Sequence, residues 1–226
     1  MPKIVNKNYK KFMTTGLMDI ITIPAFNTMI NTINLKKSHF KDLSEARAFL
    51  ILLYYSGARP VELMDLTSDS MEKSTQGHLK IVLPTAKRGK TRLIMVRNDS
   101  KSLTMVKHAE ELTKYWEKHK PIPEKLLFHN LRYLSKNPVK WKENKNSIII
   151  KKRTYFRTTK RAYYYVQKWM GIPPYYFRHN RASYMADKGA SISEISQWRG
   201  TKNNSTERYI QFTEGRVTKI AKYQDG

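Results

Sequence analysis

The chain has 226 residues, with 43 Lys and Arg against 18 Asp and Glu, so its formal charge is +25. This excess favours nucleic acid as a partner over an anionic membrane, because the sequence has neither a basic amphipathic helix nor a lipidation signal. The lack of cysteine excludes disulfides, thiolate metal sites and cysteine nucleophiles. The six histidines lack the spacing of a helical metal site, and no signal peptide or 18-residue apolar run occurs, so we expect a cytoplasmic, DNA-associated protein without a metal or a membrane anchor.

The N-terminal part of the chain predicts a basic arm followed by helices. Residues 1–20 are basic and weakly patterned, whereas 23–34 has apolar residues at helical spacing and a proline in its first turn. The stretch "LSEARAFLILLYYSG" at 43–57 is apolar nearly all round, which predicts a buried helix that ends at Gly57. "RPVELMDL" then predicts a short helix with Pro60 in its first turn.

The period of the pattern changes in the middle of the chain. Residues 78–84 and 91–97 are β-type runs that flank "TAKRGK", whose Gly89 fits a hairpin turn. Helical periodicity returns at 102–119.

The C-terminal part again favours helices. Within 120–152 only 124–134 looks helical, and 153–171 is interpreted as one long basic helix. Further helices are predicted at 175–188, 192–198 and 204–212. The fold class is therefore α+β and mainly α: one domain of packed helices over 21–212 with a small antiparallel sheet or hairpin, followed by a tail at 213–226.

Two basic residues at predicted junctions are candidates for phosphate chemistry. Arg59 stands where one helix ends and another starts, so backbone amides and a bidentate guanidinium could meet an anion there. Lys87 lies in the predicted hairpin, where its ammonium group could deliver a proton. Each has an ordinary alternative, since arginine beside proline at a helix start is common and a lysine at a turn tip is normally just solvated.

Two aromatic segments complete the candidates. In "YYFRHNRASY", Tyr175, Arg178 and Ala182 share one helical face, while His179 lies about 100° round from Arg178. The turn-rich "WRGTKNNSTERYIQF" leads to Tyr209 on a predicted short helix.

Taken together and in this order, the segments resemble the tyrosine recombinases, or phage integrase family, over roughly residues 20 to 212. "SGARPVEL" is similar to the family's "TGLRxxEL", and "AKRGKTR" to its hairpin "GKGNKxR". "YYFRHNRAS" is similar to "HxLRHxxAS", and "WRGTKNNSTERY" to "LGH…TxxY". The matched positions are Arg59, Glu62, Lys87, Arg178, His179, Ala182, Ser183, Thr206 and Tyr209.

The chain departs from the family pattern at two positions and in its length. Tyr175 replaces the first residue of the His-x-x-Arg motif, and the His or Trp usual about nine residues before the nucleophile is absent. Arg199, ten residues before Tyr209, is the nearest polar candidate for that role, and Thr201 is the alternative. These substitutions resemble the archaeal viral and plasmid integrases. The residues before 43 leave no room for the family's N-terminal domain, so we expect an isolated or a minimal catalytic domain.

The resemblance implies a recombinase that cleaves and rejoins double-stranded DNA without ATP, metal or another cofactor. Tyr209 would attack a phosphodiester to form a 3′-phosphotyrosine and free a 5′-hydroxyl. Arg59 and Arg178 would stabilise charge on the phosphorane. Lys87 would protonate the leaving oxygen, with Lys90 as the alternative general acid.

The remaining residues receive supporting roles from the same resemblance. Tyr175 would orient groups by hydrogen bonding, and Arg199 would add a phosphate donor. Tyr176, Phe177 and Tyr184 are interpreted as packing residues, His179 as a supporting or core residue, and Glu62 as a structural partner for a basic side chain.

The assembly and two rival functions also follow from the resemblance. The protein would be monomeric when free and a dimer to tetramer on DNA, with the tail at 213–226 docking on a neighbouring protomer. The rival functions are a type IB topoisomerase, which reseals the same strand, and a catalytically inactive DNA-binding relative.

Overall fold

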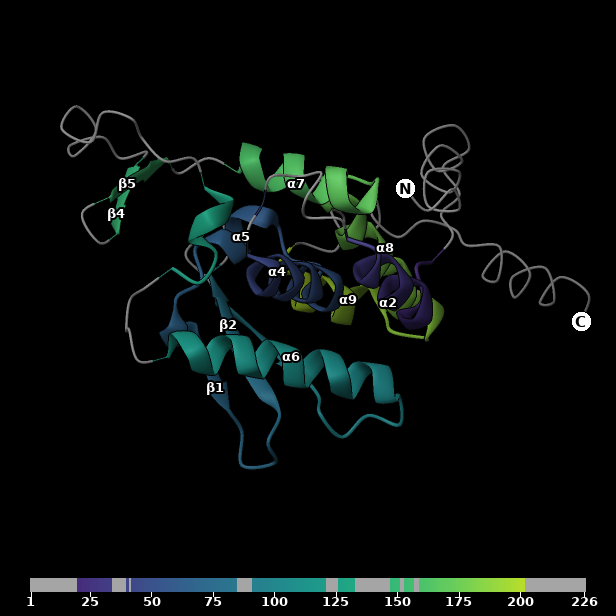
Figure 1. Ribbon diagram of the computed structural model, residues 1–226. Helices are drawn as coiled ribbons and strands as arrows, with labels where there is room; N and C mark the ends of the chain where they lie inside the picture. Colours follow the sequence, from purple (N-terminus) through teal and green to yellow (C-terminus); the bar gives the residue numbers. More distant parts are fainter. Residues whose placement is uncertain are drawn as a thin grey trace, which may run out of the picture.

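Helix α4, Leu43–Ser56, lies in the middle of the structure with other helices around it (Figure 1). The computed structural model describes residues 20–33, 40, 42–84, 91–120, 126–132, 147–150, 153–156 and 159–201, with the backbone alone at 147–150 and 153–156. Because α4 is apolar on nearly all sides, burial on every face is its favoured state, and its residues are indeed mostly buried. The predicted buried helix is confirmed.

The ends of α4 are set by local chemistry. Asp42 caps the start by accepting the amide of Glu45 at 3.0 Å. Gly57 ends the helix in the left-handed conformation at φ +51°, where its amide still donates to the carbonyl of Leu53. Helix α5, Pro60–Met64, starts at once because proline fits the first helical position.

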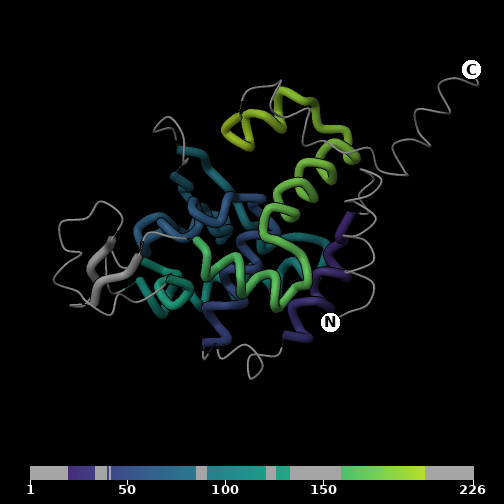
Figure 2. Tube along the Cα trace, turned by 90° about the horizontal axis from the view of Figure 1, so that it is seen from above, coloured from purple at the N-terminus to yellow at the C-terminus, as the bar shows by residue number. Residues whose placement is uncertain are grey.

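The other helices cover α4 from several sides. Helix α4 contacts α8 and α6, and α2 contacts α6 and α7. Seen from above, the chain from α7 to α9 runs in an arc beside the earlier helices (Figure 2). The predicted helices from these regions are confirmed, although the first ends at Asn31 rather than at residue 34. Their bounds are Ile23–Asn31 for α2, Leu103–His119 for α6, Lys160–Met170 for α7, Pro174–Asp187 for α8 and Ile192–Arg199 for α9.

A three-stranded antiparallel sheet stands beside α6, in the order β1-β2-β3 (Figure 1). Strands β2, Leu79–Pro84, and β3, Thr91–Val96, pair as the predicted hairpin, whose turn residues 85–90 lie outside the described part. Strand β1, Met71–Lys73, was not predicted, because a three-residue strand carries too little alternation to recognise. A short 3₁₀ turn, η1, precedes it at Ser68–Ser70.

The long helix predicted at 153–171 is wrong in its first part. Residues Arg153–Phe156 form strand β5, which pairs antiparallel with β4, Ser147–Ile150, and the helix begins only at Lys160. Threonine and aromatic residues in this segment prefer strands, and three consecutive isoleucines in β4 supply a matching partner. The described structure therefore has two antiparallel sheets, whereas the sequence predicted a single one.

The helix predicted at 124–134 is also wrong over its described residues. Leu126 forms an isolated bridge with Thr67, and a single 3₁₀ turn, η2, spans His129–Leu131. The amides of Asn130 and Leu131 donate to the buried carboxyl group of Glu45 at 2.9 and 3.2 Å. A tertiary partner therefore takes the amides that an α-helix would use. The predicted helix at 204–212 lies outside the described residues.

The start of α2 is tied to α8 and α4 by one residue, Ile21. Its amide donates to Oδ1 of Asn180 at 2.7 Å, and its carbonyl accepts the hydroxyl of Tyr54 at 2.8 Å. Phe26 then stacks on Tyr54 with ring centroids 4.1 Å apart.

None of the helices in the described part of the chain is long and apolar enough to cross a bilayer.

Candidate active site

Arg59 sits at the junction between α4 and α5 and is the partly exposed member of a polar network. Its amide donates to Oε2 of Glu62 and its Nη1 to Oε1 of the same carboxylate, each at 2.9 Å. The amide of Ala58 donates to the hydroxyl of Ser56 at 3.1 Å. The sequence predicts that backbone amides at this junction could bind an anion. That prediction is wrong for the amides of Ala58 and Arg59, because both already donate to side chains of the protein. The side chain of Arg59 remains 23% exposed.

Arg178 of α8 reaches the same junction from the other side. Its side chain is fully buried, and it donates from Nη1 to the carbonyl of Gly57 at 3.0 Å and from Nη2 to the carbonyl of Arg199 at 3.2 Å. Burial lowers the pKa of Arg178 to about 9, and repulsion from neighbouring arginines adds to this, while Glu62 opposes it. A pKa of about 9 still leaves the guanidinium charged at neutral pH.

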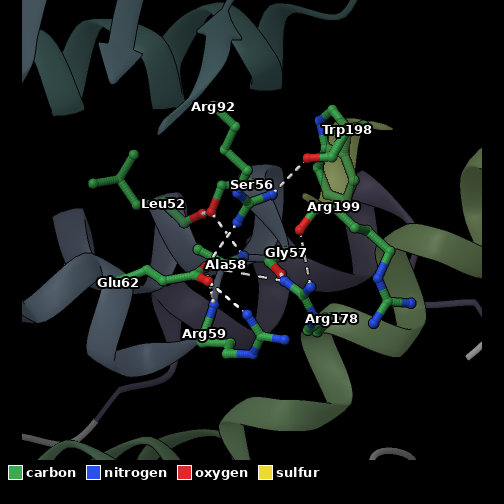
Figure 3. A network of polar contacts seen from close by, with 10 residues as sticks. All are labelled: Leu52, Ser56, Gly57, Ala58, Arg59, Glu62, Arg92, Arg178, Trp198 and Arg199. Atoms are coloured by element: carbon green, nitrogen blue, oxygen red, sulfur yellow. Dashed lines mark hydrogen bonds and ion pairs between the residues drawn. The ribbon is translucent and has the colours of Figure 1, made fainter. Parts of the chain in front are cut away.

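Glu62 of α5 is the carboxylate that three guanidinium groups surround (Figure 3). Besides the bonds from Arg59, its Oε2 accepts from Nη2 of Arg92 at 2.9 Å and lies 4.0 Å from Nη1 of Arg178. Burial alone would raise its pKa, but the charge of Arg92, the amide of Arg59 and the other arginines outweigh burial and lower it. Glu62 is therefore ionised, in line with its predicted role as a structural partner.

Arg92 of β3 is a member of this network that the sequence analysis did not single out. It occupies an inward position of the strand, and its side chain is only 5% exposed. Its Nη1 donates to the carbonyl of Trp198 at 2.8 Å, and the guanidinium lies 5.4 Å from the centroid of the same indole. The sequence did contain a signal, because the alternation of "TRLIMV" places Arg92 on the face shared with Ile94 and Val96.

Arg199 ends α9 inside the network, whereas Thr201 lies in the turn that follows. The side chain of Arg199 is fully buried, and its charge is among the causes that lower the pKa of Arg178. The amide of Thr201 closes the turn on the carbonyl of Ser196 at 3.0 Å. Of the two alternatives for this family position, Arg199 is the one that lies close to Arg178.

The five residues Arg59, Glu62, Arg92, Arg178 and Arg199 carry four positive charges and one negative charge. Uncompensated buried charge costs several kcal/mol, so a cluster with this excess favours an additional anion. The Nε of Arg178 is also buried without a hydrogen-bond partner among the described residues. Both features suit an anionic ligand that can accept several hydrogen bonds.

The aromatic residues of α8 fall into two groups. Tyr176 and Phe177 are buried in the core, as predicted, while Tyr184 is only half-buried. Tyr175 is half-buried and lies edge-on to His179, with ring centroids 5.1 Å apart and an interplanar angle of 72°. The rings of Tyr175 and His179 therefore contact each other along α8.

Other predicted site residues lie outside the described part of the chain. These are Lys87 and Lys90 between β2 and β3, and Thr206 and Tyr209 after α9. Within the described residues, no three His, Cys, Asp or Glu side chains gather as they would around a metal ion.

This combination of a mainly helical domain, a small antiparallel sheet and arginines from separate elements defines a known class. The chain matches the phage integrase family over residues 25–216, and it belongs to that family. A comparison with curated protein sequences gave no match.

Solved structures of recombinases share the fold. The XerH site-specific recombinase, in a post-cleavage complex with palindromic difH substrate, matches with a TM-score of 0.65 at 16% identity over 93% of this chain. The XerA recombinase matches with a TM-score of 0.60 at 13% identity over 94% of this chain. The match covers 53% of the XerH chain and 65% of the XerA chain, so this chain spans about half to two thirds of their length. The fold is that of a tyrosine recombinase catalytic domain.

Proposed function

We propose that this chain is the catalytic part of a site-specific DNA recombinase that works through a 3′-phosphotyrosine on Tyr209. The observation that carries the proposal is the excess of positive charge where Arg59, Arg92 and Arg178 surround the single carboxylate of Glu62 and Arg199 adds its charge next to Arg178. A phosphodiester supplies the missing negative charge, and its oxygens accept the bidentate hydrogen bonds that arginine donates.

The first step forms one bond and breaks another. The phenolic oxygen of Tyr209 gives up its proton to solvent and attacks phosphorus, and the bond from phosphorus to the 5′-oxygen breaks. A free phenol has a pKa near 10, so Tyr209 is a weak nucleophile unless the site assists it. Arg59 and Arg178 assist by stabilising the charge that develops on the non-bridging oxygens.

The leaving 5′-oxygen needs a proton. An ammonium group from the segment between β2 and β3 supplies it, and Lys87 is the first candidate with Lys90 as the alternative. The freed 5′-hydroxyl of a partner strand later attacks the phosphotyrosine and releases Tyr209. The free energy of the phosphodiester is kept in the tyrosyl ester, so the exchange needs no ATP.

Two further residues receive supporting roles. Tyr175 contacts His179 and has a neutral phenol at physiological pH, so it orients neighbouring groups through hydrogen bonds. Arg199 strengthens the positive field at Arg178 and is a further donor for the phosphate.

The partner is double-stranded DNA, and the active assembly is a dimer to tetramer on DNA that forms from free monomers. The net charge of +25 supports this partner, because phosphate neutralisation drives non-specific binding. The XerH recombinase structures contain the difH substrate, and their fold likeness supports the same class of partner here.

The test is a denaturing gel of the protein with a nicked duplex that traps the cleaved strand. We expect a covalent adduct with the wild type and none with Tyr209→Phe, while DNA affinity stays within about twofold, because the substitution removes only the nucleophilic oxygen. Tyr223→Phe, in the tail, is the matched control and should retain the adduct. An adduct that persists in Tyr209→Phe would refute the assignment. Transfer of the cleaved strand to a second duplex separates a recombinase from a topoisomerase.

A further inference from the structure

Arg92 stands at a position where charge is unfavourable. Strand β3 alternates between exposed and buried residues, and Arg92 takes a buried position opposite Leu83 of β2. Burying a guanidinium group costs several kcal/mol unless it is paired and hydrogen-bonded. Burial accordingly lowers the pKa of Arg92, and Glu62 opposes the shift. An aliphatic residue would pack there at lower cost, so the arginine calls for a specific role.

The contacts of Arg92 join three separate elements. One end of its fork reaches Glu62 on α5, and the other reaches the carbonyl of Trp198 on α9, at 2.9 and 2.8 Å. The guanidinium carbon of Arg92 also lies over the indole of Trp198, 5.4 Å from the ring centroid. One side chain on β3 thereby fixes α5 and α9 relative to the sheet. A single ammonium group could not span both acceptors with the same geometry.

The charge of Arg92 also affects how strongly Glu62 attracts Arg59 and Arg178. Glu62 accepts from Arg59 on both oxygens, and Arg92 takes part of the charge on Oε2, which lies 4.0 Å from Arg178. Without Arg92, the carboxylate would be balanced by Arg59 and Arg178 alone. Both guanidinium groups would then be drawn toward Glu62 and would be displaced from the positions where they stabilise charge that develops on the phosphate during the reaction.

The segments that Arg92 holds in place are continuous in the chain with those that carry the proposed general acid and nucleophile. Arg92 is separated by one residue from the segment 85–90, which carries Lys87 and Lys90, and Trp198 lies near the end of α9, from which the chain continues to Tyr209.

We propose that Arg92 is a positioning residue: it holds β3, Glu62 and the end of α9 in one arrangement without touching DNA itself. This inference rests on the proposed function. Two other roles give different results, because a purely structural ion pair would affect only stability and a phosphate ligand would affect DNA affinity and its salt dependence.

The experiment compares Arg92→Gln with Arg47→Gln in single-turnover adduct formation at saturating protein. Arg47 is a matched control, because it also bonds a carboxylate, Glu111, and a backbone carbonyl, that of Ile30, but it lies outside the arginine cluster. Thermal unfolding is measured for each variant, and rates are compared at equal distances below the unfolding midpoint. If Arg92→Gln does not fold, Arg92→Lys and Arg47→Lys replace the pair.

We expect Arg92→Gln to slow adduct formation by about 10- to 100-fold, the cost of misplacing reacting groups by about 1 Å. The DNA dissociation constant should stay within about twofold, and the salt slope should not change. Arg92→Lys should remain at least about fivefold slower than the wild type, because lysine keeps the charge but not the two-ended fork.

Three results would overturn the inference. They are a rate loss no larger than that of Arg47→Gln, a salt slope shallower by about one unit as for a lost phosphate contact, and full recovery of the rate in Arg92→Lys. Failure of the proposed function is recognised separately, because the wild type would then form no adduct at all, and the inference would fall with it.

Discussion

The guanidinium of Arg178 donates to the carbonyl oxygen of Gly57 at 3.0 Å, a contact between residues 121 positions apart in the sequence. The left-handed turn at Gly57 ends α4 and exposes this carbonyl to α8. Arg178 is therefore oriented by the backbone on two sides, since its other terminal nitrogen bonds the carbonyl of Arg199. An arginine held in this way is preorganised, so it does not have to reorient when charge develops on a phosphate.

Gly57→Ala should disturb the site as well as the stability. The left-handed conformation costs a non-glycine residue about 1–2 kcal/mol, and the added Cβ would lie 2.8 Å from the ring of Trp198 and 3.1 Å from Cβ of Arg181. Trp198 must shift, so we expect slower adduct formation along with a lower unfolding midpoint. Gly189→Ala is the control, because Gly189 has φ +94° but meets no atom within 4 Å. Equal rates in the two variants at matched stability would contradict the prediction.

DNA binding should weaken steeply as salt is added. If about 6 to 10 phosphates are neutralised, the slope of the logarithm of the binding constant against the logarithm of salt concentration should be about −5 to −9. Fluorescence anisotropy of a labelled duplex, recorded between about 50 and 300 mM salt, measures this slope. A slope shallower than about −2 would mean that the basic surface does not bind DNA.

The general acid can be identified with a modified leaving group. Lys87→Ala should slow cleavage of an ordinary phosphodiester much more than cleavage of a 5′-bridging phosphorothiolate, because a thiolate departs without a proton. Arg59→Ala should show no such rescue, since its charge addresses the non-bridging oxygens. Lys90→Ala is tested in parallel. Rescue by sulfur confined to Lys90→Ala would move the proton transfer to that residue.

Glu45 should make stability depend on pH. Burial raises the pKa of this carboxyl to about 8, although the amide hydrogen bonds from Asn130 and Leu131 oppose the shift. A pKa raised on folding means that the folded state keeps a proton that the unfolded state has lost. The stabilisation is present in full below about pH 4.5 and is lost as the pH rises through about 8.

Thermal unfolding of the wild type and of Glu45→Gln between pH 5 and 8, roughly the window set by these pKa values, checks this prediction. As the pH rises, the unfolding midpoint of the wild type should fall relative to that of Glu45→Gln. The corresponding loss in the free energy of unfolding is on the order of a few kcal/mol. Glu110→Gln, at an exposed position of α6, should follow the wild type. Parallel profiles for the wild type and Glu45→Gln would show that Glu45 is ionised throughout.

The sequence by itself determined the elements whose patterns are local and long. The apolar run of α4, the alternation of β2 and β3 and the capping box formed by Ser191 and Glu194 at α9 all appear in the structure. These features depend on residues a few positions apart, which a linear pattern records. The order of four motifs also identified the family, and with it Arg59 and Arg178 as candidates that the structure brings to one junction.

Only the tertiary structure decided which distant residues share a partner. Strand β5 replaces the first turns of a predicted helix because β4 lies beside it, and the segment around Asn130 leaves the helical state because Glu45 takes its amides. In the same way, Arg92 became part of the arginine cluster because Glu62 and Trp198 come within reach of its fork. Such choices are made by hydrogen bonds and charges between segments far apart in the chain, and local periodicity carries no record of them.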